Sequence, residues 1–167
     1  MEIGATKAVQ DRLKTTKIEE SKGASLVFCW DTHLTKIKGR NVLFIVNASN
    51  RYTIAMTDIE PRNWNYYAMY IIRVIHGMMQ EMGYSEEQIE QYFKMSGDTT
   101  VTKTHGRKSV GGINRMVMDA QYFGKKLEKE AKYQWELSEY LNRDICQPEG
   151  FDAYGYPNEL LAMLQKR

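Results

Sequence analysis

Four runs of β-prone residues between positions 25 and 57 limit the possible folds of this chain more than any other feature. Two turn-like segments, Gly39-Arg40 and Ser49-Asn50-Arg51, fall where short hairpin connections belong. This spacing predicts a three-stranded antiparallel meander over about residues 32–57. The four runs cover residues 25–30, 34–38, 41–47 and 52–57.

Helical patterns follow the meander. Apolar side chains recur at intervals of three and four residues, and this period predicts an amphipathic helix over residues 63–82 that packs across one face of the sheet. Ser85 and Gln88 then match the capping-box pattern, in which each residue's side chain bonds to the other's backbone. A second helix is therefore predicted over residues 86–95.

Other segments complete an α+β pattern. Residues 1–6 predict a short strand, and Thr6 is the expected N-cap of a helix over residues 7–14. Residues 99–104 are rich in threonine and predict another strand. Ser109 is expected to cap a further amphipathic helix. The predicted fold is α+β, with a mainly antiparallel sheet of about five strands packed by two long helices.

The composition shifts toward Lys, Glu and Tyr after Gln121. We interpret this segment as a solvated helix, followed by a loop and a terminal helix over residues 158–166. The chain of 167 residues therefore divides into a predicted α+β core domain, residues 1–120, and a helical C-terminal extension, residues 121–167, packed on or beside it. The expected apolar stripe of the solvated helix consists of Leu127, Ala131, Trp135 and Tyr140.

The cysteines and histidines bear on compartment and metal content. Cys29 and Cys146 are far apart in the sequence, and we interpret them as buried thiols in a reducing cytoplasm. The chain begins without the basic and apolar stretches of a secretory signal. The histidines (His33, His76 and His105) lack clustered ligand spacing, so we predict no cofactor and no metal. A metal site could be assembled only by the tertiary fold.

No apolar run approaches the roughly 20 residues that cross a bilayer, so we expect no membrane partner. The net charge is only +2, and the sequence does not indicate an oligomeric state. Its charge distribution is more informative, because the window between Asp98 and Asp119 contains no acid. That window holds four basic residues, Lys103, Arg107, Lys108 and Arg115.

This basic window combines a strand, a glycine-containing turn and the start of a helix. A helix N-terminus offers unpaired backbone N–H groups and the positive end of the helix dipole, which favour a phosphate group. The segment is not a P-loop, because G-x-x-x-x-G-K-[ST] is absent. The predicted ligand-binding residues are Thr102, Lys103, Thr104, His105, Arg107, Lys108, Ser109 and Asn114.

The basic window favours a non-enzymatic protein that binds a phosphate-bearing ligand, either a nucleotide or a nucleic-acid backbone. A simpler alternative is that Ser109 only caps a helix and the basic side chains are solvated. A different functional alternative is a phage or mobile-element protein that inhibits a host system through an aromatic surface. The predicted partner-binding residues of that surface are Tyr133, Trp135, Tyr140, Phe151, Tyr154 and Tyr156.

A third alternative is an enzyme that cleaves a phosphate ester, with His105 as acid or base. Asp31 and His33, which follow Trp30, could also bring a carboxylate and an imidazole into a cleft. No nucleophile has a spacing that supports either arrangement. We therefore favour a protein that is not an enzyme, and the sequence does not identify catalytic residues.

The order of several motifs resembles a family of small bacterial and phage proteins described as a domain of unknown function. The resemblance covers about residues 1–120, and the family's late motif reads T-K-T-x-x-R-S-V-x-G-x-x-N. In this sequence Lys108 stands between Arg107 and Ser109. The match therefore needs either a one-residue insertion or, more simply, Lys108 in place of the family's arginine, where it would act as a point charge. The resemblance implies an α+β fold and a bacterial or phage cytoplasmic protein, with no known activity. The matching positions are Ile3, Ala5, Thr6, Lys7, Trp30, residues 42–47, residues 102–104, Arg107, Ser109, Val110, Gly112 and Asn114.

Overall fold

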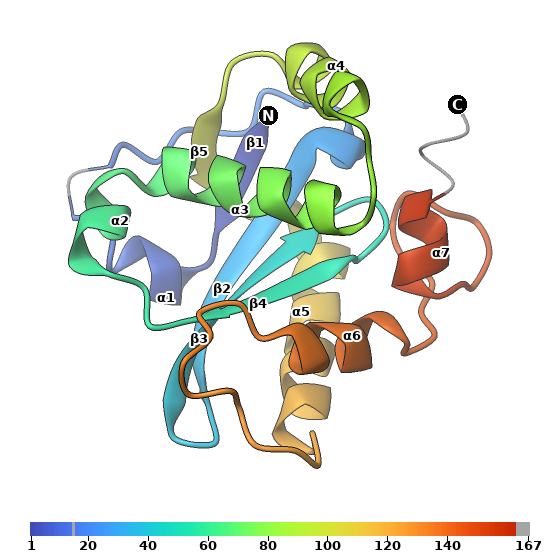
Figure 1. Ribbon diagram of the computed structural model, residues 1–167. Helices are drawn as coiled ribbons and strands as arrows, with labels where there is room; N and C mark the ends of the chain where they lie inside the picture. The colour runs from blue at the N-terminus through green and yellow to red at the C-terminus, as the bar shows by residue number, and fades with distance from the viewer. Residues whose placement is uncertain (15, 163–167) are drawn as a thin grey trace.

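The computed structural model describes residues 1–14 and 16–162 and shows a five-stranded sheet with helices on both faces (Figure 1). The strands lie in the order β4-β3-β2-β1-β5, so β1 is internal. The strands are β1 (Glu2–Ala5), β2 (Cys29–Ile37), β3 (Arg40–Asn47), β4 (Thr53–Thr57) and β5 (Thr100–Lys103).

The sheet is mixed. Strands β2, β3 and β4 pair antiparallel, which confirms the predicted meander. Strand β1 pairs parallel with both β2 and β5. The α+β class is therefore confirmed, but the predicted antiparallel pairing holds only for the meander. Strand patterns indicate where strands lie and not which strands pair, and parallel neighbours are joined through long connections that sequence spacing does not reveal.

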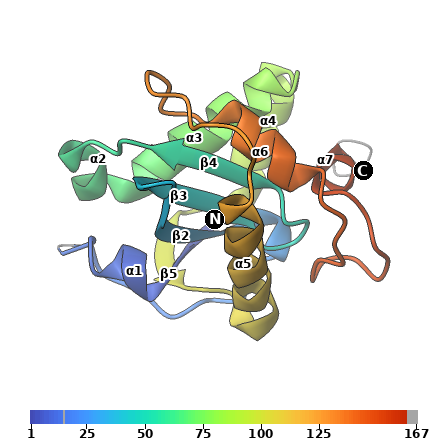
Figure 2. The ribbon, with the colours of Figure 1, turned by 90° about the horizontal axis from the view of Figure 1, so that it is seen from below.

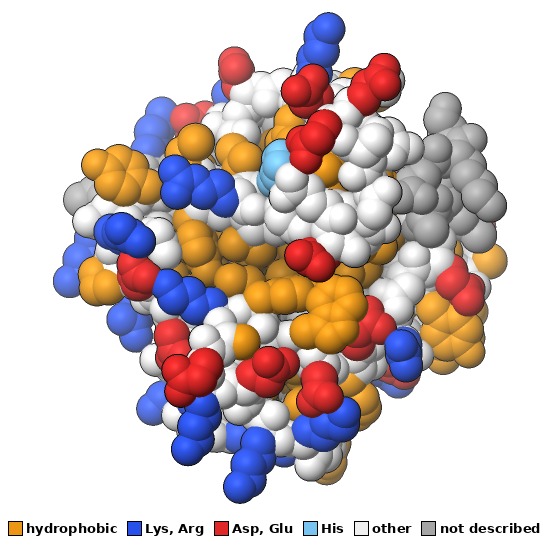
Figure 3. Space-filling model, in the orientation of Figure 1, with side chains coloured by type: hydrophobic (Ala, Val, Ile, Leu, Met, Phe, Trp, Pro, Cys, Tyr) orange, Lys and Arg blue, Asp and Glu red, His pale blue; other side chains and the backbone are white. Residues whose placement is uncertain are grey.

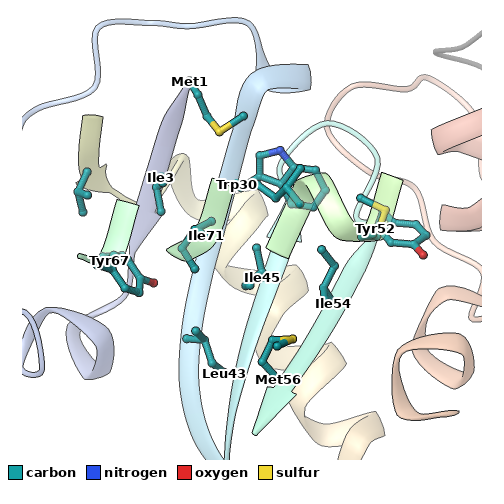
Figure 4. Packing of buried hydrophobic residues seen from close by; sticks show 14 of the residues in the cluster. Met1, Ile3, Trp30, Leu43, Ile45, Tyr52, Ile54, Met56, Tyr67 and Ile71 are labelled. Carbon is teal, nitrogen blue, oxygen red and sulfur yellow. The ribbon is translucent and has the colours of Figure 1, made fainter. Parts of the chain in front are cut away.

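Helix α3 (Tyr67–Glu81) crosses one face of the sheet, as expected (Figure 1). A short helix, α2 (Pro61–Asn65), precedes it, so the predicted single helix is interrupted at Tyr66. Side chains such as Leu43 and Ile45 fill the space between the sheet and α3 (Figure 4). Full burial of each such side chain stabilises the fold by about 1.5–3 kcal/mol.

Two shorter helices pack on the same side. Helix α4 (Glu86–Ser96) begins at the predicted capping box, where Ser85 Oγ accepts from the Gln88 N–H at 3.3 Å and Gln88 Oε1 accepts from the Ser85 N–H at 2.9 Å. Helix α1 (Lys7–Gln10) is shorter than predicted. Thr6 occupies its N-cap position, but the Thr6 side chain makes no capping hydrogen bond.

Helices α5 (Gly106–Gln121) and α6 (Trp135–Asn142) cover the other side of the sheet, opposite α1 and α2 (Figure 2). The prediction that Ser109 caps α5 is wrong, because the helix begins three residues earlier at Gly106. Gly106 has a φ of 87°, a left-handed value that glycine adopts without steric cost. This glycine lets the chain turn from β5 directly into α5.

The segment between α5 and α6 is not helical, so the predicted solvated helix through Leu127 and Ala131 is wrong. Its Lys and Glu residues favour a helix locally. The backbone instead bonds to the edge of the sheet, where the Thr57 N–H donates to the Lys132 carbonyl at 2.7 Å. Phe123 and Leu127 are buried in the core beneath α5 and α6.

Helix α6 supplies hydrogen bonds to the backbone of β4 at the edge of the sheet. Asn142 Oδ1 accepts from the Thr53 N–H at 2.7 Å, and Asn142 Nδ2 donates to the Thr53 carbonyl at 2.8 Å. Ser138 Oγ accepts from the Ala55 N–H at 3.0 Å. An uncovered edge strand would present unpaired backbone groups for pairing with another chain. The side chains of α6 therefore protect this edge.

Helix α7 (Pro157–Ala162) begins one residue before the predicted terminal helix, whose last residues lie outside the described part of the chain. The division into residues 1–120 and 121–167 stays a prediction. In the described residues, no helix combines the length and the apolar character that crossing a membrane requires. Cys29 and Cys146 are both free thiols.

Candidate functional site

The parallel pairing of β1 with β2 brings four residues to one face of the sheet. Glu2 pairs with Cys29, and Gly4 pairs with Asp31. Because side chains alternate along a strand, these four positions share one face, and the residues between them face the apolar core beneath α3. This arrangement places two carboxylates and a thiol side by side.

His105 joins this layer from the junction of β5 and α5. Its Nδ1 donates to Asp31 Oδ1 at 2.7 Å, and its Nε2 donates to Glu2 Oε2 at 3.0 Å. The backbone N–H of His105 also donates to the Asp31 carboxylate at 3.2 Å. The imidazole therefore bridges two carboxylates from adjacent strands.

The two carboxylates also have donors besides His105. Ser109, in the first turns of α5, donates its hydroxyl proton to Asp31 Oδ2. Ser21 Oγ donates to Glu2 Oε2 at 2.6 Å, and the Lys22 N–H donates to Glu2 Oε1 at 2.7 Å. Buried charges are stable only when such partners replace the water that they lose.

The His105 cluster, defined as Glu2, Asp31, His105 and Ser109, is closed to solvent. The side chains of His105, Glu2 and Asp31 are 5%, 3% and 0% exposed. Burial alone would lower the pKa of His105, but the hydrogen bond to Asp31 and the neighbouring Cys29 raise it to about 10. Burial would raise the pKa of Glu2, but the hydrogen bonds that it accepts lower it. The cluster therefore holds an imidazolium beside a carboxylate.

Gly4 makes room for this cluster. A Cβ atom built on Gly4 would overlap Oδ1 of Asp31 and would lie 3.1 Å from Nδ1 of His105. The absence of a side chain at Gly4 thus allows the bridging hydrogen bond to form directly over β1.

The sequence places Asp31 and His33 close together, but in the structure the imidazole partner of Asp31 is His105. His33 Nδ1 lies 3.1 Å from Thr6 Oγ1, and burial lowers the pKa of His33. Glu2 was not singled out at all. The sequence feature that could have identified Glu2 is that it is the acidic residue of an otherwise apolar first strand. Its role becomes clear only when the strands on either side of β1 are known.

The structure separates the eight predicted ligand-binding residues. Thr102 and Ser109 are buried, and the His105 side chain lies within the cluster. Lys103 is exposed and forms an ion pair with Glu20 at 2.6 Å. The other four also remain accessible. Arg107, Lys108 and Asn114 are exposed on α5, and Thr104, just before this helix, is partly exposed.

Arg51 lies outside the basic window of the sequence, but the fold places it beside the start of α5. Its guanidinium donates to the Lys108 carbonyl at 3.3 Å and occupies the space where a Cβ on Gly112 would lie. Among the described residues, no ion pair involves Arg51, Arg107 or Lys108, whereas Lys103 is paired. We call these three residues, Arg51, Arg107 and Lys108, the basic surface.

Two hollows differ in what they could accept. A depression of about 10 Å³ beside the basic surface is lined in part by Arg51, Lys108 and Glu149. A cavity of about 480 Å³ lies elsewhere, between the start of β2, α3 and α4, with Trp30 and Tyr92 among its walls. None of the described residues that line the larger cavity is charged, so it offers a phosphate group no counter-charge.

The predicted partner-binding aromatic residues differ in exposure. Trp135, Tyr140 and Tyr156 are 40%, 43% and 42% exposed, and Tyr154 is 69% exposed. Tyr133 and Phe151 are partly buried. The Tyr133 ring packs edge-on against Trp135, with 5.6 Å between the ring centroids. On the face that carries α3, hydrophobic side chains gather in a hollow across the middle, with charged side chains around it (Figure 3).

The fold and site define an α+β protein with a mixed sheet, a buried His–carboxylate cluster and an exposed basic surface next to it. The chain belongs to the family described as domain of unknown function (DUF6933), which matches residues 2–160. The expected membership of a family of unknown function is confirmed at that level, and the match extends beyond residue 120. No curated protein and no solved structure matches the chain.

Proposed function

We propose that the protein is a non-enzymatic binding protein that recognises the phosphate groups of a nucleic-acid backbone at its basic surface. The observation that carries this proposal is the position of Arg107 and Lys108. Both are exposed in the first turn of α5, and neither forms an ion pair within the described residues. Unpaired cations next to a helix N-terminus attract anions through both charge and the helix dipole.

The start of α5 supports this proposal. No side chain caps the helix and no acidic residue lies in its first turn. The Gly106 N–H bonds to the Thr104 carbonyl at 3.0 Å. Arg51 adds a third positive charge from the turn between β3 and β4, and Asn114 follows Arg107 by two helical turns on the same side of α5.

The dimensions of the site favour a nucleic-acid backbone over a free nucleotide. Small-molecule sites usually enclose about 300–1,000 Å³. The depression beside Lys108 holds only about 10 Å³. A polyanion that lies across the surface requires no enclosing pocket, because its phosphates are recognised from one side.

Salt-dependent binding of labelled DNA and RNA oligonucleotides tests this proposal. We expect affinity to fall steeply with salt, and the double variant Arg107→Ala/Lys108→Ala to lose about two units of the log–log salt slope. The control Lys126→Ala/Lys129→Ala removes the same charge from two exposed lysines in the segment between α5 and α6. Equal affinities for the wild type and the α5 double variant would refute the proposal. A parallel arm with ATP distinguishes a nucleotide from a polymer.

A second candidate function is protein interaction through the C-terminal aromatic residues. The observation that favours it is the exposure of Trp135, Tyr140, Tyr154 and Tyr156, because exposed aromatic side chains commonly anchor interfaces. In this case a Tyr154→Ala/Tyr156→Ala variant would stay folded and lose capture of the partner. Capture that survives this change would eliminate the candidate.

We do not propose the ester-cleaving function. A general acid or base must approach the reacting atom to hydrogen-bond distance. The His105 side chain is 5% exposed, and both of its ring nitrogens are engaged with carboxylates.

A further inference from the structure

The three side chains of Glu2, Cys29 and His105 meet at one point inside the protein. Their ligand atoms, a carboxylate oxygen, a thiol sulfur and an imidazole nitrogen, all lie within 4.8 Å of one another. Within residues 1–14 and 16–162, no other group of three or more His, Cys, Asp or Glu side chains has its ligand atoms this close together. These residues are widely separated in the sequence, so no sequence motif predicts that they form a group.

The backbone holds these three groups firmly. Glu2 and Cys29 are direct partners in the parallel β1–β2 ladder, so their side chains leave the same face of the sheet. His105 follows β5, which pairs with β1 on its other side. Ligands that are carried by paired strands keep their spacing better than ligands on loops.

Asp31 orients the imidazole for a ligand. It accepts from His105 Nδ1 at 2.7 Å and thereby directs Nε2 toward Glu2. Metal-binding histidines commonly donate their other ring N–H to a carboxylate in this way, which fixes the tautomer and makes the coordinating nitrogen more basic. Ser109 in turn donates to Asp31 and holds the carboxylate in place.

Cys29 distinguishes this arrangement from a simple buried ion pair. Its sulfur lies 3.4 Å from the Ser25 carbonyl and 3.6 Å from the Ala24 carbonyl, and neither carbonyl belongs to the pairing of His105 with the carboxylates. A buried cysteine alone is an ordinary small side chain. Beside an oriented imidazole and a carboxylate, it completes a set of sulfur, nitrogen and oxygen donors.

We propose that Glu2, Cys29 and His105 bind a divalent transition-metal ion, with Zn²⁺ the best match, and that Asp31 is the positioning residue of this site. Zinc accepts thiolate, imidazole and carboxylate ligands in one tetrahedral site, whereas magnesium and calcium require oxygen ligands. Metal binding releases two protons to solvent, one from the Cys29 thiol and one from Nε2 of His105, because a thiolate and a deprotonated imidazole nitrogen are the ligands. Because the site is closed, the ion enters as the protein folds. This inference is independent of the basic surface.

Refolding with metal provides the test. Protein unfolded in urea with a chelator is refolded with Zn²⁺ alone or Co²⁺ alone. We expect one equivalent of metal per chain, a higher melting temperature and, with Co²⁺, a near-ultraviolet thiolate charge-transfer band. Cys146→Ala should keep this band, and because the chain has only two cysteines, the band would then arise from Cys29.

Variants of the site separate binding from folding. Cys29→Ala keeps a small apolar side chain and should abolish the charge-transfer band, while Asp31→Asn should weaken metal binding by about 10- to 100-fold. Circular dichroism checks that each variant is folded. Failure of both the wild type and Cys146→Ala to take up either metal would overturn the proposal, and so would a band that Cys146→Ala removes. Neither result depends on whether the Cys29 variant folds.

Discussion

His105 Nδ1 donates to Asp31 Oδ1 at 2.7 Å, although 74 residues separate the two in the chain. This hydrogen bond links β2 to the start of α5 across β1. It also sets the boundary between the buried cluster and the basic surface, because the next residues of α5 are exposed. The strength of this link determines several measurable properties.

Asp31→Asn should strongly destabilise the protein. The substitution removes the charge that pairs with the buried imidazolium, and breaking a buried ion pair costs about 3–5 kcal/mol. Urea denaturation in the presence of a chelator measures this loss. Asp11→Asn changes an exposed aspartate that pairs with Lys7, and it should cost less than about 1 kcal/mol. Similar losses in the free energy of unfolding for both variants would contradict a stabilising role of the buried Asp31–His105 pair.

Gly4→Ala tests the space above β1. The new Cβ would overlap the Asp31 carboxylate, so we expect a loss of about 1–3 kcal/mol from overpacking. Gly77→Ala is the matched control, because a Cβ there meets nothing within 4 Å and lies within α3. This control should stabilise the protein by up to about 1 kcal/mol through helix propensity. Thermal unfolding should therefore show shifts of opposite sign.

The metal-free protein should lose stability as the pH rises. The folded protein raises the pKa of His105 to about 10, whereas an unfolded histidine titrates near 6.5. The folded state therefore binds this proton more tightly. The resulting stability is fully present below pH 6.5 and is lost as the pH approaches 10.

Urea midpoints of chelator-treated protein, recorded between pH 6 and pH 10, measure this dependence. The difference between the wild type and His105→Gln should shrink across that range, because other titrating groups are common to both proteins. A difference that stays constant with pH would show that His105 is not protonated in the folded state.

Asn142→Ala should destabilise the protein, because it removes the hydrogen bonds between α6 and the edge strand β4. Asn142 is fully buried and satisfies both backbone groups of Thr53. Each buried group left without a partner costs about 1–3 kcal/mol. Arg143→Ala, next in the chain, changes an exposed side chain that pairs with Glu139, and it should have little effect on the urea midpoint.

The parts of the fold that sequence patterns predicted depend on neighbours along the chain. The meander follows from alternating residues and short turns, and the capping box follows from Ser85 and Gln88 alone. The predicted helix through Leu127 failed for the opposite reason. Its local preference is helical, but the Lys132 carbonyl accepts hydrogen bonds from the N–H and the hydroxyl of Thr57, which lies 75 residues earlier in the chain. These long-range bonds outweigh the local preference.

In the candidate site too, local sequence predicted some features and long-range contacts decided others. The charge pattern drew attention to Arg107 and Lys108, and the structure leaves both exposed. The same pattern also selected His105 and Ser109 for an external anion. The structure turns their side chains inward to Asp31, because α5 begins at Gly106 and places Ser109 one turn inside the helix.

The sequence by itself determined the α+β class, the meander and the basic window, since each depends on residue types and spacings within a few positions. The tertiary structure alone decided that β1 lies between β2 and β5, and therefore that Glu2, Cys29 and His105 meet. Strand pairing is a long-range choice, made by the packing of both faces of the sheet. Residues 103 positions apart, such as Glu2 and His105, become neighbours only through that choice.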